Sequence, residues 1–431
     1  MKEVDLVALR SERRNGTING DNPQVIVVGA GPAGMMLALL LSRSGVSVTV
    51  LEQATTFARE FRGELLQPGA TRILNDLGLR ERILSLSSGF PAGLDIQYDR
   101  KTVRFDFPRP DELSKGGGVA IIPQKQFLEA LATEASRQAG FEIVMGCSVR
   151  DLLFDAHGVV GVRAQLYNGE SLTLRAPLVV ACDGRFSAVR RAAGIEMRAK
   201  SIPFDLLWFS TPIPTGLPNR VYVRITRNQL FGSFASRNNR MQVGWLIHKG
   251  EYARLRTQPF GETVDRIVSH VPVQLSDSVR RALRGWNDLS LLPVVSQMAE
   301  RWSQPGMLLL GDAAHPMSPA GGQGINVAIY DAVVAAARLL PAIKDGASLE
   351  DVARSFERER RPSIIVTQRL QNVFTSALCT LGPSAAVRFA TLFIRAGARV
   401  SWHPRFVRKA LDRLLWGNPQ VRADRGPWQR R

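Results

Sequence analysis

Three features of this 431-residue chain predict an α/β fold. A glycine-rich turn near the N-terminus lies between an apolar run and a segment with helical apolar spacing. Two more glycine turns, much later in the chain, each follow a short apolar run, and the region between those two alternates apolar with polar residues. Parallel strands with helices explain the turns, whereas alternation is typical of antiparallel strands. We therefore expect a discontinuous parallel-sheet domain with an inserted, mostly antiparallel sheet and a C-terminal helical tail.

The first elements form a β-α-β unit. Val25–Val28 is a short β-branched run, residues 32–41 have helical apolar spacing, and residues 46–52 carry valines at alternate positions. A strand, a helix and a second strand of these lengths make one Rossmann-like unit, which binds nucleotides. The pattern does not continue as a plain doubly wound sheet, so we expect the rest of this domain to come from separated segments.

The turn inside this unit is Gly29-Ala30-Gly31-Pro32-Ala33-Gly34. Gly29 permits the tight turn, Gly31 lets the backbone approach a pyrophosphate, and Gly34 lets the helix pack on the strand. The helix N-terminus then faces phosphate with unpaired N–H groups. Glu52 lies 18 residues after Gly34 and is placed for both hydroxyls of an adenosine ribose. The segment predicts nucleotide binding, with a merely structural glycine turn as the alternative.

Later segments supply the remaining elements. The predicted strands are residues 96–107, 142–144, 178–181 and 307–310; residues 163–174 form a hairpin that turns at Asn168-Gly169; and the predicted helices are residues 127–139 and 324–340, the second followed by Pro341. Residues 201–292 alternate over several short runs, with a turn at Asn238-Asn239, and predict the antiparallel sheet. This sheet is expected to cover a ligand. Its aromatic residues, each of which could line a pocket or pack in the core, are Trp208, Phe209, Tyr222, Phe231, Phe234 and Trp245.

Two further glycine segments follow buried strands: Cys182-Asp183-Gly184-Arg185 and Gly311-Asp312-Ala313-Ala314-His315-Pro316. Asp312 sits where a strand ends, which suits a carboxylate that accepts hydrogen bonds from a ribityl chain. Downstream, Pro319-Ala320-Gly321-Gly322-Gln323-Gly324 offers bare backbone N–H groups that lead into a helix N-terminus. Such a loop can hold the pyrimidine edge of a flavin and stabilise negative charge at N1 and O2. The three segments together predict FAD, bound along its whole length.

On these motifs the chain resembles the class A flavoprotein monooxygenases of the para-hydroxybenzoate hydroxylase fold, which include ubiquinone-pathway and aromatic polyketide hydroxylases. The resemblance covers about residues 24–371. Its marks are Gly29-x-Gly31-x-x-Gly34, Asp183-Gly184 running into Arg190, and Gly311-Asp312-Ala313-Ala314-His315 continuing to Pro319, Gly322, Gly324 and Asn326. The Trp-x-Trp-x-Ile-Pro signature of flavin halogenases is absent.

The resemblance implies roles for single residues. Asp183-Gly184 is expected near the flavin pyrophosphate, where it also serves the nicotinamide cofactor, while Arg62 reaches toward phosphate and Gln124 toward the ribityl chain. Taken as residues alone, Arg62 could be solvated and Gln124 could simply start a helix. The Pro319 carbonyl is expected to line the reaction centre, and no side chain is assigned as catalytic. The expected FAD contacts are Gly29, Gly31, Ala33, Gly34, Glu52, Arg62, Gln124, Val149, Asp183, Gly184, Asp312, Pro319, Gly321, Gly322, Gln323, Gly324, Ile325 and Asn326.

The family's chemistry explains why the chain shows no Ser-His-Asp set or paired carboxylates. In that chemistry transient NADPH or NADH reduces tightly bound FAD, O2 adds to give a C4a-hydroperoxide, and one oxygen passes to an electron-rich substrate, so the cofactor carries the reaction. For His315 a packing or hydrogen-bonding role is favoured over proton transfer. The resemblance therefore implies a monooxygenase that hydroxylates or epoxidises a hydrophobic, aromatic or polyketide-like substrate. Two alternatives stay open: a flavin-dependent reductase or dehydrogenase of the same fold, and a non-catalytic, flavin-stabilised, membrane-associated binding protein.

The charge balance bears on partners and location. The formal net charge is +18, and residues 361–431 carry 13 Lys or Arg against Asp412 and Asp424, a net of 13 − 2 = +11. No nucleic-acid motif accompanies this charge, so we expect no nucleic-acid partner. Residues 405–415 have helical spacing, with apolar residues on one face and basic ones on the other, and such a helix could cap the substrate domain or lie on an anionic membrane. A cytoplasmic protein is expected, either free or peripheral at the inner face of the membrane.

Other composition features exclude some sites and set the expected domains. The three cysteines and five histidines are widely spaced, which predicts neither disulfides nor a bound metal. The oligomeric state is not predicted. The expected domains are a mobile arm at residues 1–23, an FAD-binding domain at 24–95, 111–200 and 293–371, a substrate domain at 96–110 and 201–292, and a basic helical region at 372–431.

Overall fold

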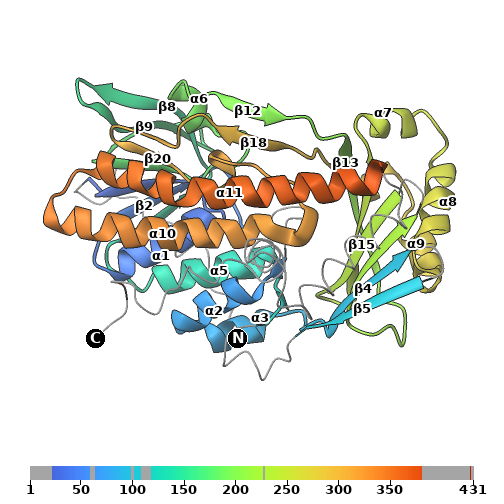
Figure 1. The fold of residues 1–431 in the computed structure, drawn as a ribbon. Helices are drawn as coiled ribbons and strands as arrows, with labels where there is room; N and C mark the ends of the chain where they lie inside the picture. Colours follow the sequence, from blue (N-terminus) through green and yellow to red (C-terminus); the bar gives the residue numbers. More distant parts are fainter. Residues whose placement is uncertain are drawn as a thin grey trace, which may run out of the picture.

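The computed structural model describes residues 22–58, 64–98, 101–107, 118–226, 229–380 and Trp428. Over these residues the chain has the predicted α/β fold, with a parallel sheet and helices on one side and an antiparallel sheet on the other (Figure 1). Segments far apart in sequence contribute to each sheet, as the separated motifs predicted.

A six-stranded sheet forms the centre of the first region, in the order β19-β20-β11-β1-β2-β7. Its strands are parallel except for the edge strand β19, which is antiparallel to β20. Strands β1 and β11 are wholly buried, because helices cover one face of the sheet and a second, smaller sheet covers the other. The strands are β1 (Val25–Val28), β2 (Val48–Glu52), β7 (Phe141–Met145), β11 (Leu178–Ala181), β19 (Ser303–Gln304) and β20 (Met307–Leu309).

Smaller sheets flank this centre. The three-stranded sheet β10-β9-β8 is antiparallel, and its β9–β10 turn contains Gly169 with φ 89°, which confirms the hairpin predicted at Asn168-Gly169. Two strand pairs, β3–β6 and β12–β18, join more distant segments. The strands are β3 (Leu65–Leu66), β6 (Ala120–Ile121), β8 (Cys147–Asp155), β9 (Gly158–Leu166), β10 (Ser171–Arg175), β12 (Met197–Lys200) and β18 (Ser296–Ala299).

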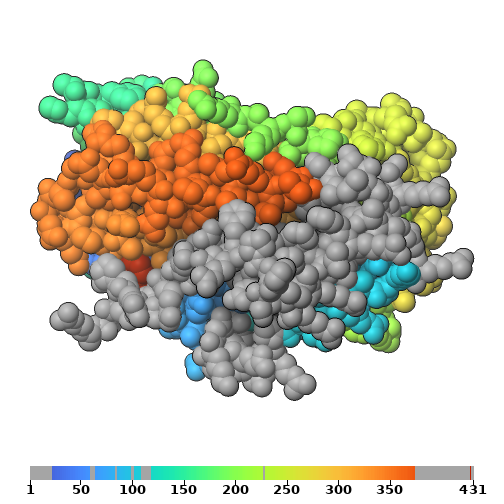
Figure 2. Space-filling view, in the orientation of Figure 1, coloured from blue at the N-terminus to red at the C-terminus, as the bar shows by residue number. Residues whose placement is uncertain are grey.

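Helices α1, α5, α10 and α11 pack on the parallel sheet and on one another (Figure 1). Helix α1 is apolar on every side and is buried from Ala33 to Ser42, so it lies inside the core. Helices α10 and α11 form a continuous surface over this region in the space-filling view (Figure 2). Trp428 is also buried, with 4% of its surface exposed, in the same core. The helices are α1 (Pro32–Arg43), α2 (Pro68–Asp76), α3 (Arg80–Leu86), α5 (Gln124–Ala135), α6 (Ala188–Ala192), α10 (Gln323–Asp345) and α11 (Leu349–Thr380).

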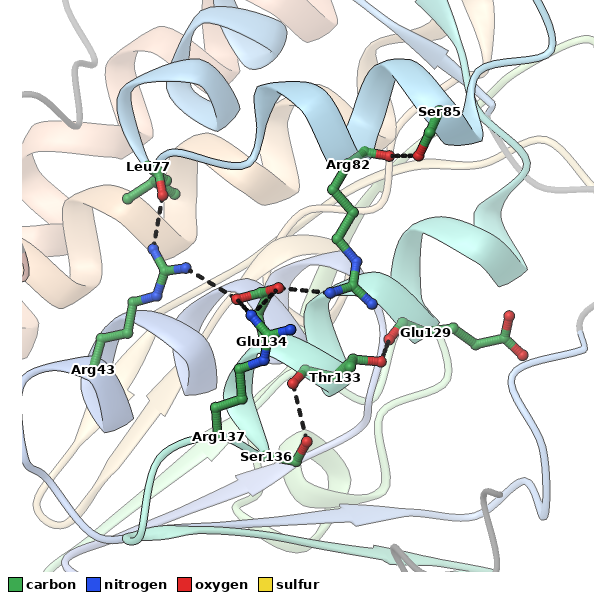
Figure 3. Close-up of polar contacts among 9 residues, drawn as sticks. All are labelled: Arg43, Leu77, Arg82, Ser85, Glu129, Thr133, Glu134, Ser136 and Arg137. Atoms are coloured by element: carbon green, nitrogen blue, oxygen red, sulfur yellow. Dashed lines mark hydrogen bonds and ion pairs between the residues drawn. The ribbon is translucent and has the colours of Figure 1, made fainter. Parts of the chain in front are cut away.

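Glu134 on α5 ties three helices together (Figure 3). Its carboxylate lies 3.6 Å from Arg43 Nη2 of α1, 2.6 Å from Arg82 Nη1 of α3 and 3.0 Å from Arg137 Nη1. Arg43 also donates to the carbonyl of Leu77 at 2.8 Å. One carboxylate thus holds the N-terminal βαβ unit against the segments that follow it.

The second region is a seven-stranded sheet in the order β17-β13-β16-β15-β14-β4-β5. Every neighbouring pair is antiparallel except β14–β4, which confirms the mostly antiparallel prediction. Asn238 and Asn239, in the turn between β15 and β16, adopt positive φ angles of 58° and 54°, which asparagine accepts more readily than most residues. The strands are β4 (Gly93–Tyr98), β5 (Lys101–Asp106), β13 (Phe204–Pro212), β14 (Val221–Thr226), β15 (Gln229–Ser236), β16 (Arg240–His248) and β17 (Ser290–Leu292).

Helices α7 (Glu251–Leu255), α8 (Phe260–His270) and α9 (Ser276–Ala282), which the sequence did not predict, follow β16. Residues of α8 and α9 share a buried core with one face of the sheet. Phe209, Tyr222, Phe231 and Trp245 belong to this core. Four of the six aromatic residues proposed for a pocket or a core therefore pack in the core.

Three element predictions need correction. Residues 96–107 are not one strand but the paired strands β4 and β5, with Tyr98 opposite Lys101. The helix predicted at residues 127–139 begins at Gln124 and ends at Ala135. The helix predicted at residues 324–340 runs through Pro341 to Asp345. Proline removes a helical hydrogen bond, and burial of the flanking Leu339, Leu340 and Ala342 offsets that loss.

Candidate active site

In the first glycine turn, Gly29 and Gly34 are packed so closely against backbone atoms that neither has room for a side chain. A Cβ atom on Gly34 would lie 2.0 Å from the Gly29 carbonyl oxygen, and one on Gly29 would lie 2.5 Å from the Cys182 carbonyl oxygen. Gly29 also has φ 99°, a conformation that favours glycine. Gly31 is the N-cap of α1 and has no side-chain cap, so the first N–H groups of the helix stay available to a ligand. The geometry fits the tight turn predicted at Gly29 and the close packing predicted at Gly34, while the approach of Gly31 to a pyrophosphate stays a prediction.

Glu52 lies at the end of β2 and is 3% exposed. Its Oε2 accepts the Ala30 N–H at 2.7 Å and its Oε1 accepts the Ala54 N–H at 3.0 Å. Each carboxylate oxygen has a second lone pair, which can accept one more hydrogen bond. The carboxylate is therefore fixed against the glycine turn, and its contact with a ribose stays a prediction.

The Asp183-Gly184 turn follows β11. Asp183 Oδ2 accepts the N–H groups of Ala188 at 2.7 Å and Val189 at 3.2 Å, while its Oδ1 is buried with no hydrogen-bond partner. Burial raises the pKa of Asp183 above its ordinary value, against opposing hydrogen bonds from Ser187 and these backbone groups. Gly184 has φ 82°, and a Cβ there would meet nothing within 4 Å. The turn thus holds one buried carboxylate oxygen that has no hydrogen-bond partner.

Arg190 joins this turn to the third glycine segment. The guanidinium is buried and donates to the Ala313 carbonyl at 2.8 Å and to the Arg185 carbonyl at 3.1 Å. Two motifs about 130 residues apart in sequence are therefore held side by side, as the predicted FAD site requires.

The Gly311–Asp312 turn is supported from below by Asp331 of α10. Asp331 Oδ2 accepts the Gly311 N–H at 3.2 Å and His315 Nε2 at 2.8 Å, and its Oδ1 accepts Arg360 Nε of α11 at 2.8 Å. Gly311 has φ 58°. Burial alone would raise the pKa of Asp331, but the charges and hydrogen bonds of His315 and Arg360 hold it below its ordinary value. The carboxylate is thus charged and fully paired.

His315 is held inside this network. An ionised carboxylate only accepts hydrogen bonds, so Nε2 carries the hydrogen in the contact with Asp331. The ring is 1% exposed and lies 4.8 Å, centroid to centroid, from the Trp302 ring. The hydrogen-bonding and packing role favoured from the sequence fits this position.

The glycine loop before α10 has two left-handed residues in succession, Gly321 with φ 75° and Gly322 with φ 62°. The Pro319 carbonyl accepts the Gly322 N–H at 2.9 Å, so its predicted place at the reaction centre stays a prediction. Asn326 is fully buried and accepts the Gln67 N–H at 2.8 Å while donating to the Leu65 carbonyl at 3.1 Å. The loop is thus anchored to β3.

Helix α11 holds the segment before this loop. Gln371 Nε2 donates to the Ser318 and Ala320 carbonyls at 2.9 and 2.8 Å. Gln368 Nε2 donates to the Gln297 and Pro316 carbonyls at 2.8 and 3.1 Å. The path of the chain on both sides of Pro319 is therefore fixed.

The other predicted contacts are placed as follows. Ala33, Gln323 and Ile325 are buried at the N-terminal ends of α1 and α10, and Val149 on β8 is buried in the same core cluster as Ala33 and Ile325. Gln124 begins α5, and its Oε1 is buried with no hydrogen-bond partner. Arg62 lies outside the described residues. Cofactor contacts of all these residues stay predictions.

The residues present fit FAD. Asp183 Oδ1 and Gln124 Oε1 are unpaired buried oxygens, and a buried polar atom without a partner is costly unless a ligand or water meets it. Both residues were predicted to contact the cofactor. A Cβ atom on Gly184 or on Gly324 would meet nothing within 4 Å, so protein atoms do not fill the space beside either residue. Within the described ranges, no group of three or more His, Cys, Asp or Glu side chains is arranged to hold a metal ion.

Sequence reasoning missed the residues that support the site. Asp331 gave one signal, since a carboxylate in the apolar helix α10 needs a partner. Gln67, Arg360, Gln368 and Gln371 gave none, because polar residues are ordinary on loops and helices.

Comparison with known proteins agrees with this geometry. A family model described as an FAD binding domain matches residues 22–371. A 6-methylpretetramide 4-monooxygenase of Streptomyces rimosus is 33% identical over 413 residues, which are 94% of each chain. A squalene epoxidase of Arabidopsis thaliana is 24% identical over 82% of this chain and 69% of its own. The crystal structure of PqsL from Pseudomonas aeruginosa, a probable FAD-dependent monooxygenase, has a TM-score of 0.72 and 25% identity and covers 87% of this chain and 100% of its own.

The chain belongs to the FAD-binding-domain family of class A flavoprotein monooxygenases. It is an FAD-dependent monooxygenase, an enzyme class whose usual second cofactor is NAD(P)H. One described helical stretch, Ala320–Asp345, is long and apolar enough to span a membrane, but 83% of its most apolar window is buried, as in the core helix of a soluble domain.

Proposed function

We propose that this monooxygenase uses NADPH or NADH and O2 to hydroxylate, or to epoxidise, a hydrophobic small molecule of the aromatic polyketide class. The observation that carries the proposal is the 33% identity, along nearly the whole of both chains, with an enzyme named for an aromatic polyketide. Squalene epoxidases among the relatives support the hydrophobic character and keep epoxidation open.

One face of the seven-stranded sheet suits such a substrate. Residues directly opposite each other on paired strands share a face. Trp208 lies opposite Gly244, Gly244 opposite Gly232, and Gln242 opposite Phe234, so these five residues share the face away from the α8–α9 core. The Trp208 and Phe234 rings are 5.9 Å apart, and Trp208 Nε1 donates to Gln242 at 3.0 Å. The two partly buried aromatic rings, tilted by 54° to each other, and the uncovered backbone at Gly232 make an aromatic surface.

The same face reaches the cofactor region. Ser236, two residues beyond Phe234 on β15, donates to Glu64 Oε2 at 2.8 Å. Glu64 directly precedes β3, and Leu65 would touch a Cβ on Gly322 at 3.6 Å. The aromatic surface is therefore linked to the glycine loop through Ser236, Glu64 and Leu65. We place the substrate between this surface and the loop.

Bound FAD would supply the oxygen-transfer chemistry, and the chain would hold the reactants and exclude water. Backbone N–H groups at Gly31 and at the start of α10 would meet the phosphates and the flavin ring. Asp183, near the pyrophosphate, and Gln124, near the ribityl chain, would each use the unpaired oxygen to accept a hydrogen bond from a hydroxyl group of the cofactor. The domain boundaries and a cytoplasmic location are part of the same proposal, as is docking or membrane contact by residues 372–431, most of which lie outside the described residues.

The test combines oxygen uptake, NADH or NADPH oxidation and mass spectrometry on FAD-loaded protein supplied with a tetracyclic aromatic polyketide phenol. We expect O2-dependent formation of a product with one added oxygen atom. Turnover of the same substrate under strict anaerobiosis would contradict the proposal and favour a reductase. Trp208→Ala should raise KM or divert reducing equivalents to peroxide, whereas Leu291→Ala, an exposed position on the same sheet, should change neither.

A further inference from the structure

The hydrogen-bonded group of Asp331, His315 and Arg360, which holds the Gly311 N–H, points to a function beyond packing. Asp331, His315 and Arg360 are 0%, 1% and 3% exposed, and together they join the Gly311 turn, α10 and α11. Burying charged groups is costly, and replacing a buried ion pair by well-packed apolar residues is often neutral or stabilising. Stability alone is therefore a weak reason for this arrangement.

The contact with the backbone gives a better reason. Gly311 is in a left-handed conformation at the end of β20, and its N–H points to Asp331 Oδ2 at 3.2 Å. On the other side of the turn, Arg190 holds the Ala313 carbonyl at 2.8 Å. The Leu310–Gly311 peptide before Asp312 and the Ala313–Ala314 peptide after it are therefore each held by a side chain from another part of the chain.

We propose that Asp331 is a positioning residue for FAD: its carboxylate fixes the Gly311 peptide and so directs Asp312 toward the ribityl chain, while Arg360 keeps that carboxylate charged. Asp331 acts through Asp312 and does not itself touch the cofactor. The inference rests on the cofactor-binding role proposed for Asp312.

Helix α11 takes part in the same function. Arg360, Gln368 and Gln371 lie eight and three residues apart, which places them on one face of a helix. They contact Asp331, the Pro316 carbonyl and the Ala320 carbonyl in turn. This face therefore supports the site from the Gly311 turn to the glycine loop, and α11 is coupled to FAD binding.

A double-mutant cycle on FAD binding tests the inference. Asp312→Ala, Asp331→Asn and the double variant are prepared as apoprotein, and the Kd for FAD is measured by quenching of flavin fluorescence. We expect each single change to raise Kd by roughly tenfold, the size of one lost charge-assisted hydrogen bond. If Asp331 acts through Asp312, the double variant should be little weaker than either single variant.

The outcomes separate this inference from the proposed function. Multiplicative effects in the double variant would overturn the positioning role, because Asp331 would then act independently of Asp312. An unchanged Kd in Asp312→Ala would instead contradict the proposed FAD site. Thermal unfolding of each apoprotein is measured alongside, since a purely structural residue would lower the melting temperature without coupling to Asp312.

Two further variants complete the design. Arg338→Gln removes an exposed ion pair to Glu359, 2.8 Å long, that also joins α10 to α11, and it should leave the Kd for FAD unchanged. If Asp331→Asn apoprotein does not fold, Arg360→Lys replaces it in the cycle, since it keeps a positive charge while losing the hydrogen-bond geometry at Asp331 Oδ1. If Arg360→Lys and Asp312→Ala then changed the Kd for FAD by factors that simply multiply in the double variant, the inference would be overturned.

Discussion

Two carboxylates near the predicted cofactor site, the partly buried Asp183 in the turn after β11 and the fully buried Asp331 on α10, differ in how they are paired. Asp331 has partners on both oxygens, and its pKa lies below the ordinary value. Asp183 has one buried oxygen with no partner, and its pKa lies above the ordinary value. Groups of the protein itself satisfy both oxygens of Asp331 but only one oxygen of Asp183.

The same contrast separates the glycines. Gly34 is packed against backbone, whereas a Cβ atom on Gly324 would meet nothing within 4 Å. We therefore divide these residues into a supporting layer, with Asp331 and Gly34, and a predicted ligand-facing layer, with Asp183 and Gly324. Substitutions in the first layer should cost stability, and those in the second should cost cofactor affinity.

The largest effect is expected for Gly34→Ala. Its Cβ would lie 2.0 Å from the Gly29 carbonyl oxygen, so strand β1 and helix α1 must separate. We expect a loss of more than about 4 kcal/mol in the free energy of unfolding, measured by chemical denaturation. Wild-type-like unfolding would show that the turn is not close-packed.

Asp331→Ala should come next. It leaves the buried Arg360 guanidinium without its carboxylate, and breaking a buried pair in this way costs about 3–5 kcal/mol. Denaturation of the apoprotein measures the loss. A change below about 1 kcal/mol, the scale of exposed pairs, would place Asp331 outside the supporting layer.

Asp183→Asn should lower the affinity for FAD while leaving the stability of the apoprotein nearly unchanged. The amide oxygen can still accept the Ala188 N–H, so the apoprotein should keep its stability within about 1 kcal/mol. The Kd for FAD should rise by about tenfold, because a neutral amide oxygen is a weaker acceptor than a carboxylate oxygen for a hydroxyl group of the cofactor. FAD affinity is measured by equilibrium titration and stability by chemical denaturation. If the variant lost stability but kept its affinity for FAD, Asp183 would belong to the supporting layer.

The pH dependence should have opposite signs for the two carboxylates. For Asp183 the folded pKa is raised above 3.8, so its stabilising contribution is present below that value and is lost as pH rises through the folded pKa. For Asp331 the folded pKa is lowered below 3.8, so its contribution is present above that value and is lost as pH falls through the folded pKa. Differences in unfolding free energy between wild type and each Asn variant, measured across acidic pH, should therefore slope in opposite directions.

The smallest effect is expected for Gly324→Ala. Alanine is favoured over glycine within a helix by about 1 kcal/mol, and the added methyl group meets open space, so the apoprotein should become slightly more stable. FAD binding should weaken, because the methyl group occupies space assigned to the flavin. Tighter FAD binding together with higher stability would remove Gly324 from the ligand-facing layer.

Much of the fold could be predicted because it depends on local pattern. The limits of β1 and β11 match the apolar runs at Val25–Val28 and Leu178–Ala181. The hairpin at residues 96–107 was missed because Asp99-Arg100 lacks the glycine or Asn-Gly signal of a tight turn. Pro341 looked like the end of a helix, but burial on both sides of it outweighs the proline penalty.

The site divides in the same way. Glycine spacing marked the segments that face the cofactor, because close approach of backbone to phosphate requires glycine at fixed positions. Asp331 contacts residues 16, 20 and 29 positions away, and only the packing of α10 against the Gly311 turn and against α11 brings them together. No local pattern could have shown those pairings.

Trp428 has a consequence for the end of the chain. Its side chain is inserted in the core of the first region, only three residues before the C-terminal Arg431. An indole ring buries a large apolar area, so a deletion that stops short of Trp428 would uncover the part of the core that the ring now shields from water.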